Sequence, residues 1–123
     1  MAYESKLLVV FKSDTKSWEA TMSDFYICEE IATFKLCQVD SDVREKFLSY
    51  PNTDCCIWVN DEPTHTDCYG QEIKEIPIKD AIKILNYASS AHDYRRYEPC
   101  ASLLRGFNTS EWDDKLVVLH YGY

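Results

Sequence analysis

The chain has 123 residues, of which 21 are acidic and 13 basic, so its formal net charge is −8. A chain of this length folds as one domain and buries about two-thirds of the surface of its unfolded form, so it needs no disulfide or metal for stability. The 46% apolar content excludes a disordered chain, and the acidity disfavours direct binding to nucleic acid or to a membrane.

The first part of the chain predicts a strand, a helix and a second strand. Residues 6–12 (KLLVVFK) form an apolar run rich in β-branched and aromatic side chains, which is typical of a central strand buried on both faces. Apolar residues then recur mostly every three or four positions from Trp18 to Phe34, which predicts an amphipathic helix that ends near Thr33. Residues 34–39 (FKLCQV) alternate apolar and polar side chains and predict the second strand.

The middle of the chain predicts a short helix and a hairpin. Residues 40–45 resemble a capping box, and the helix that follows, over 43–48, carries its apolar side chains on an inner face. The continuous apolar run 55–59 (CCIWV) predicts a third strand. Residues 60–63 then predict a turn, and residues 64–69 a fourth strand that pairs back on the third.

The last part of the chain predicts a helix, one or two helical turns and a late strand. Pro77 opens the helix, at the position where a missing N–H costs least. The helical pattern is lost over residues 89–97, and residues 99–104 predict one or two helical turns. Residues 116–121 (LVVLHY) predict a strand. The sequence leaves open whether this strand extends the sheet of its own chain or that of a second copy in a homodimer.

The order of these elements over residues 5–89 resembles the thioredoxin superfamily. Residues 7–11 are similar to its central strand, residues 35–40 to its second strand with an acidic end, and residues 55–59 to the first arm of its hairpin. The resemblance implies an α/β fold with a mixed sheet flanked by helices. We therefore expect a thioredoxin-like core over residues 1–89 and a C-terminal extension over 90–123, with a helical turn and a strand, packed on the same domain.

Two departures from the superfamily point to a protein without disulfide-exchange activity. Its oxidoreductases carry Cys-x-x-Cys between the first strand and the helix, where the thiol pKa is lowered. Here residues 13–19 contain no cysteine. The position of the superfamily's cis-proline corresponds to Thr53, and Pro51 lies two residues earlier. We therefore expect a redox-inactive domain that needs no cofactor.

The cysteines are interpreted mainly as packing residues. The opening of the chain has an apolar run too short for a signal peptide or a membrane span, which favours an intracellular, cytoplasmic protein with reduced thiols. The adjacent pair Cys55 and Cys56 has a second interpretation as a strained, regulatory disulfide. A zinc site is the other alternative, although strand alternation would place two of its ligands on opposite faces. Its candidate ligands are Cys55, Cys56, His65 and Cys68.

Acidic and aromatic surface residues predict a protein-binding function. Trp and Tyr side chains in a polar frame are the usual anchors of protein interfaces. The acidity favours a basic or nucleic-acid-binding protein as the partner, and a viral-type inhibitor that mimics nucleic acid is the first alternative function. A thiol- or zinc-dependent enzyme is the second. The candidate partner-binding residues are Asp14, Thr15, Trp18, Glu19, Thr53, Asp61, Glu62 and Trp112.

One basic segment interrupts this acidity. Residues 94–97 (YRRY) carry two adjacent arginines. We expect these arginines to fix the C-terminal extension to the acidic core, and contact with a carboxylate on a partner is the alternative.

Overall fold

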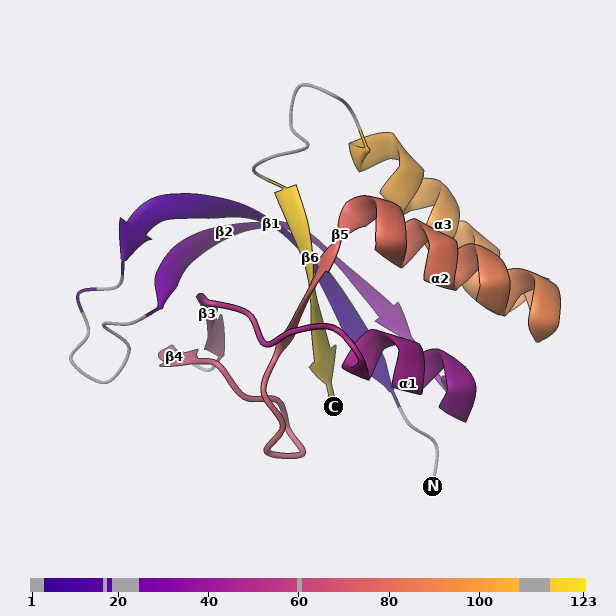
Figure 1. Cartoon of the computed structure of the whole chain (residues 1–123), viewed down its shortest axis with the longest axis horizontal. Helices are drawn as coiled ribbons and strands as arrows, with labels where there is room; N and C mark the ends of the chain where they lie inside the picture. The colour runs from indigo at the N-terminus through magenta and orange to yellow at the C-terminus, as the bar shows by residue number, and fades with distance from the viewer. Residues whose placement is uncertain (1–3, 17, 19–24, 60, 109–115) are drawn as a thin grey trace.

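The computed structural model describes residues 4–16, 18, 25–59, 61–108 and 116–123. Within these residues the chain is a mixed α/β protein whose sheet has the strand order β4-β3-β2-β1-β6-β5 (Figure 1). Strands β2, β1, β6 and β5 are antiparallel neighbours, and the short β3–β4 hairpin joins the edge of β2 through two parallel residue pairs. In chain order the elements are β1 (Ser5–Lys16), β2 (Tyr26–Leu36), α1 (Ser41–Leu48), β3 (Cys55–Val59), β4 (Glu62–Thr64), β5 (Lys74–Pro77), α2 (Ile78–Ala91), α3 (Tyr94–Phe107) and β6 (Leu116–Gly122).

The largest correction concerns the helix predicted after the first strand. Residues 26–36 form strand β2, which pairs with β1 as an antiparallel hairpin. The β-α-β crossover predicted for the start of the chain is therefore wrong. A bulge explains the error: Val9 of β1 pairs with Ala32, whereas Val10 pairs with Glu30, so Ile31 is an extra residue in β2. The bulge shifts the phase of the strand, and a broken two-residue alternation looks like three- and four-residue spacing.

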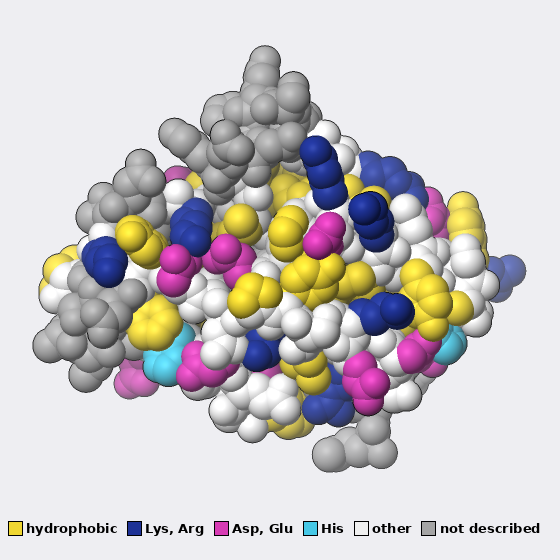
Figure 2. Space-filling model, in the orientation of Figure 1, with side chains coloured by type: hydrophobic (Ala, Val, Ile, Leu, Met, Phe, Trp, Pro, Cys, Tyr) yellow, Lys and Arg dark blue, Asp and Glu magenta, His cyan; other side chains and the backbone are white. Residues whose placement is uncertain are grey.

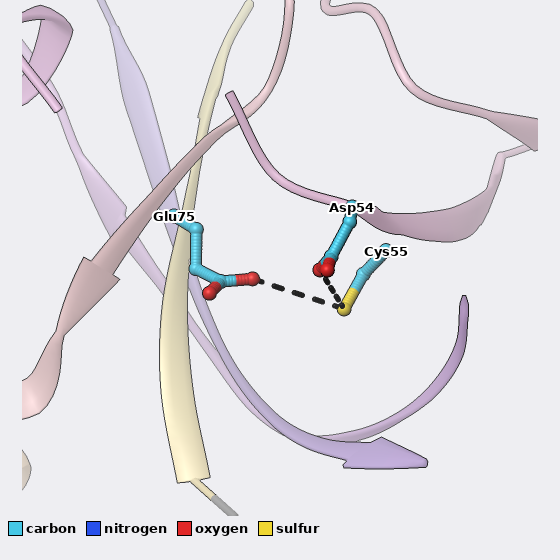
Figure 3. Close-up of side chains that lie close together, drawn as sticks. All are labelled: Asp54, Cys55 and Glu75. Atoms are coloured by element: carbon cyan, nitrogen blue, oxygen red, sulfur yellow. Dashed lines mark hydrogen bonds between the residues drawn. The ribbon is translucent and has the colours of Figure 1, made fainter. Parts of the chain in front are cut away.

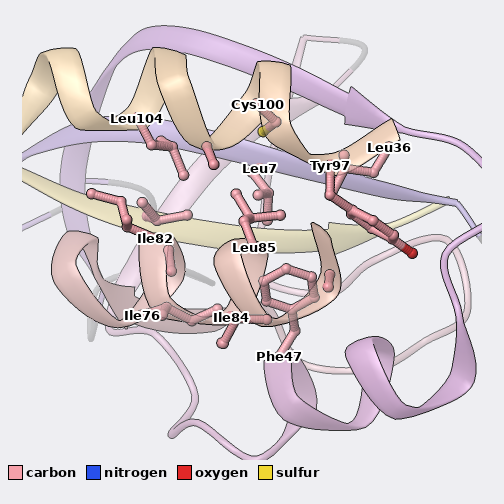
Figure 4. Close-up of a cluster of buried hydrophobic side chains, with 14 of the residues drawn as sticks. Leu7, Leu36, Phe47, Ile76, Ile82, Ile84, Leu85, Tyr97, Cys100 and Leu104 are labelled. Carbon is pink, nitrogen blue, oxygen red and sulfur yellow. The ribbon is translucent and has the colours of Figure 1, made fainter. Parts of the chain in front are cut away.

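Strand β1 is the central strand, as predicted. Its side chains from Leu7 to Val10 are all buried, because each face of the strand contributes to a different core. Leu7 and Val9 belong to the larger core together with residues of all three helices (Figure 4). Leu8 and Val10 belong to a smaller core that contains no helical residue of the described chain. The described helices thus lie against one face of the sheet.

The C-terminal part of the chain contributes strand β6 to the sheet and helix α3 to the larger core. Strand β6 pairs with β1 on one side and with β5 on the other, so the late strand extends the sheet of its own chain. Helix α3 replaces the predicted helical turns and contains Pro99. Asp93 caps its first turn by accepting a hydrogen bond from the Arg95 N–H. The proposed boundary between residues 89 and 90 therefore separates elements that share one sheet and one core.

The remaining predicted elements match in part. Helix α1, strand β3 and helix α2 are confirmed within one or two residues of their predicted starts. The fourth strand is shorter and earlier than predicted, because Asp61 adopts a positive φ of 63° that turns the chain directly into β4. Among the described residues the longest helices have 14 residues, and none has the length and apolar character needed to cross a bilayer.

Candidate functional site

The face of the sheet that the helices leave uncovered carries two groups of polar residues. Alternate residues of β1 point toward this face, beginning with Lys6 and ending with Lys12. Lys12 belongs to a charged cluster at one end of the strand, and Lys6 lines a cavity near the other end.

The charged cluster consists of Lys12, Thr53, Asp54, Cys55 and Glu75 (Figure 3 shows the last three). Lys12 Nζ lies 2.5 Å from Asp54 Oδ1 and 3.4 Å from Glu75 Oε2. Cys55 Sγ lies 3.9 Å from Glu75 Oε1 and 4.0 Å from Asp54 Oδ1. The Thr53 hydroxyl donates to Glu75 Oε1 at 3.0 Å. The cluster therefore joins three segments of the chain that are far apart in sequence.

The electrostatics of this cluster favour a structural role. Burial lowers the pKa of Lys12, but the hydrogen bond with Asp54 and the charge of Glu75 outweigh it, so the pKa lies above its ordinary value. The Lys12 ammonium is thus held in its charged form between two carboxylates. A hydrogen bond from the Cys28 thiol lowers the pKa of Cys55, while the same contact and burial raise that of Cys28. Because Cys55 is fully buried, its sulfur is not accessible as a nucleophile.

The four candidate zinc ligands are not gathered into one site. Among the described residues, the only set with ligand atoms at metal-binding spacing is Asp54, Cys55 and Glu75, within 4.8 Å of one another. Lys12 already neutralises its carboxylates, so a metal ion would have to displace this ammonium. His65 instead contacts Glu72 at 2.8 Å. The Cys68 sulfur contacts the Tyr121 hydroxyl at 3.1 Å, and Cys56 is buried in β3, with no disulfide to Cys55.

The second group surrounds a cavity of about 160 Å³, which we name the Trp58 cavity. Its floor is apolar, formed by the buried side chains of Leu8 and Ile57. Trp58 stands at its rim with 55% of its surface exposed. An exposed aromatic ring beside a cavity is a common feature of binding surfaces. The lining residues are Lys6, Leu8, Glu30, Thr33, Ile57, Trp58 and Tyr121.

The predicted partner-binding residues are divided by the structure. Trp18, Asp61 and Glu62 are exposed, as an interface requires. Thr53 is only 4% exposed, so its assignment to a binding surface is wrong. Its hydroxyl accepts from the Cys55 N–H and donates to Glu75, which explains a buried polar side chain here. Glu19 and Trp112 lie outside the described residues, as do the side chains of Asp14 and Thr15.

Trp58 is the residue that the sequence-based prediction missed. It lies within the run 55–59, where continuous apolar character favoured a fully buried strand. Alternation offered the signal, because Cys55 and Ile57 point into the smaller core and residue 58 points the other way. Strand β3 lies between β2 and β4 in the sheet, and Trp58 is 55% exposed there.

The acidic residues do not form one uninterrupted surface on the face that Figure 2 shows, where acidic and basic side chains are interspersed. Arg96 lies 3.5 Å from Asp40 and 3.7 Å from Asp93, and the Tyr97 hydroxyl donates to Asp40 at 2.8 Å. The prediction that the arginine segment fixes the C-terminal part to the acidic core is confirmed for Arg96. Many other carboxylates are similarly engaged with a basic side chain or a histidine, namely Asp42, Asp54, Glu72, Glu75 and Glu98.

Comparisons of this chain with protein-family models, with curated proteins and with solved structures find no match.

Proposed function

We propose that the protein is a redox-inactive binding module that docks another protein on its Trp58 surface, defined as Glu30, Trp58, Asp61 and Glu62. The observation that carries this proposal is the exposure of Trp58, which lines a cavity together with Lys6 and Leu8 of the face of the sheet without helices. Partly exposed Trp side chains beside a pocket are typical anchors of protein interfaces. The charge of the surface favours a basic partner.

The acidic residues beside Trp58 support the choice of partner. Glu62 pairs with Val59 across the β3–β4 hairpin, and Asp61 forms its turn, so both lie next to Trp58 in the hairpin. Glu30 lines the same cavity as Trp58. Glu30, Asp61 and Glu62 are exposed, and no basic side chain of the described residues forms an ion pair with them. Three such carboxylates in the segments that neighbour Trp58 complement a basic segment.

The likeness to the thioredoxin superfamily remains a prediction from the sequence, and the proposed function does not depend on it. The antiparallel pairing of β1 with β2 speaks against the first crossover of that fold. Redox inactivity is supported by the absence of cysteine from residues 13–19 and by the burial of Cys55 and Cys56. The cytoplasmic location predicted above belongs to the same proposal.

A capture experiment from the native host tests the proposal. The immobilised protein is compared with Trp58→Ala and with Tyr94→Ala, a control on α3 whose aromatic ring is 66% exposed. We expect the captured protein to be lost with Trp58→Ala, retained with Tyr94→Ala, and released as salt is raised. Equal capture by Trp58→Ala would overturn the choice of surface, and thioredoxin-level reduction of insulin would overturn redox inactivity.

The same experiment addresses the alternative of a nucleic-acid mimic. A mimic predicts that added DNA or RNA competes with the module for the captured protein, because both occupy one phosphate-binding groove. The engagement of many carboxylates in internal ion pairs makes this alternative less favourable, since these groups are not free to replace phosphates. Capture that nucleic acid displaces, and that Trp58→Ala leaves unchanged, would favour the mimic.

A further inference from the structure

The bulge in β2 builds one wall of the Trp58 cavity. In a regular strand, side chains three residues apart point to opposite faces of the sheet. Glu30 and Thr33 are three residues apart, yet both line the cavity, because the extra residue Ile31 shifts the phase between them. The Thr33 hydroxyl donates to Glu30 Oε1. The bulge thus brings Glu30 and Thr33 to the same cavity, and the Thr33 hydroxyl is hydrogen-bonded to the Glu30 carboxylate.

Lys6 supplies a positive charge to the same cavity. Its ammonium lies 4.9 Å from the ring centroid of Tyr123 and 5.8 Å from that of Tyr121. Both rings attract the cation through their faces and hold it near β6. In the described part of the chain, no acidic group lies within 4.0 Å of the Lys6 ammonium, and no basic group lies that close to the Glu30 carboxylate.

The cavity therefore holds two opposite charges that do not pair with each other. Both charges line one space with an apolar floor, formed by Leu8 and Ile57. A ligand that satisfies all three features carries a carboxylate, an ammonium and an apolar group. The volume of about 160 Å³ is close to that of a cavity of ~150 Å³ that accepts benzene, so a phenyl-sized group fits.

We infer that the Trp58 cavity binds a free apolar α-amino acid as the zwitterion. The α-carboxylate pairs with Lys6, and the α-ammonium pairs with Glu30. The side chain lies on the apolar floor formed by Leu8 and Ile57. This small-molecule site goes beyond the proposed protein-binding function and does not require it, because it is formed by one chain alone.

Titration of the purified protein with L-phenylalanine tests the inference. We expect saturable binding at millimolar or lower concentration, with the amide signals of Leu8, Thr33 and Ile57 shifting in NMR spectra. Two analogues each lack one charge: phenethylamine has no carboxylate, and 3-phenylpropanoate has no ammonium. Each is expected to bind about three- to tenfold more weakly, the range expected for a partly exposed ion pair.

Matched variants assign each charge to its residue. Lys6→Met is expected to weaken the binding of L-phenylalanine about three- to tenfold and to leave the binding of phenethylamine unchanged. Glu30→Gln is expected to weaken the binding of L-phenylalanine to the same extent and to leave the binding of 3-phenylpropanoate unchanged. Lys35→Met and Glu29→Gln are controls, because these residues neighbour Lys6 and Glu30 in the sheet without lining the cavity.

Several results would overturn this inference. One is the absence of saturable binding, and another is equal binding of all three ligands. A third is an unchanged affinity in both charge variants. Capture of the protein partner is also measured on Lys6→Met, because Lys6 lines the cavity but is not part of the Trp58 surface, so that failure of the amino-acid site and failure of the proposed function are seen separately.

Discussion

The buried histidine of β6 predicts that the protein loses stability in mildly acidic solution. His120 is 1% exposed, its Nε2 lies 2.8 Å from the Ser5 hydroxyl, and its ring stacks on Phe47. Burial lowers its pKa to about 4, and the positive charges of Arg44 and Lys74 act in the same direction. The folded protein therefore keeps a neutral imidazole at a pH where the unfolded chain has already bound a proton.

The magnitude follows from the difference between the two pKa values. In the unfolded chain the pKa is 6.5, so the difference from about 4 amounts to ~2.5 units, or about 3 kcal/mol. Above pH 6.5 the imidazole is neutral in both states, and its contribution to stability is complete. As the pH falls from 6.5 toward 4, the unfolded chain takes up the proton and this contribution is lost.

Urea unfolding at a series of pH values checks this prediction. His120→Gln removes the titration and retains a polar side chain, so its free energy of unfolding should depend less steeply on pH between 6.5 and 4 than that of the natural chain. His65→Gln is the control, since that half-exposed imidazole belongs to neither core and contacts Glu72. An NMR titration of the His120 ring in the natural chain gives a second measurement if the variant does not fold. A measured pKa near 6.5 would refute the reasoning.

The other predictions concern the two cores and their polar contacts. Phe47→Ala removes a fully buried ring beneath His120 and should lower the free energy of unfolding by about 3–5 kcal/mol in urea titrations; a loss below ~1 kcal/mol would contradict its place in the core. Tyr97→Phe removes the hydroxyl that bonds both the N–H and the carboxylate of Asp40, and should cost about 1–2 kcal/mol in the same assay. Lys12→Met leaves two carboxylates without their cation and should cost about 1 kcal/mol near neutral pH, with the loss shrinking in acid. If the free energy of unfolding of Lys12→Met equals that of the natural chain at every pH, the ion pairs of Lys12 contribute nothing to stability.

Local sequence patterns were sufficient for elements whose period is regular. The run 6–12 is apolar at every central position, and a strand buried on both faces is the element that such a run forms. Helix α2 buries Ile78, Ala81, Ile82 and Leu85, whose three- and four-residue spacing is complete within the helix itself. These elements were predicted because the information that specifies them lies within a few residues of each other.

Strand β2 and helix α3 show where local patterns fail. The bulge at Ile31 becomes defined only when β1 lies beside β2, so nothing in residues 26–36 alone distinguishes a shifted strand from a helix. In α3, Pro99 and the polar residues before it favour an interruption, yet burial of Tyr97, Cys100, Ala101 and Leu104 against α2 and the sheet stabilises the full helix. Packing free energy exceeded local propensity in both elements.

The sequence by itself determined the size of the protein, its mixed α/β character, its central strand and the presence of acidic and aromatic side chains. Only the tertiary structure decided which of these residues act together. In the folded chain the buried Thr53 donates a hydrogen bond to Glu75, and the exposed Trp58 lines a cavity together with Lys6 and Glu30. The physical reason is that these contacts join residues from separate strands, and the pairing of those strands depends on burial of both faces of the sheet rather than on any local pattern.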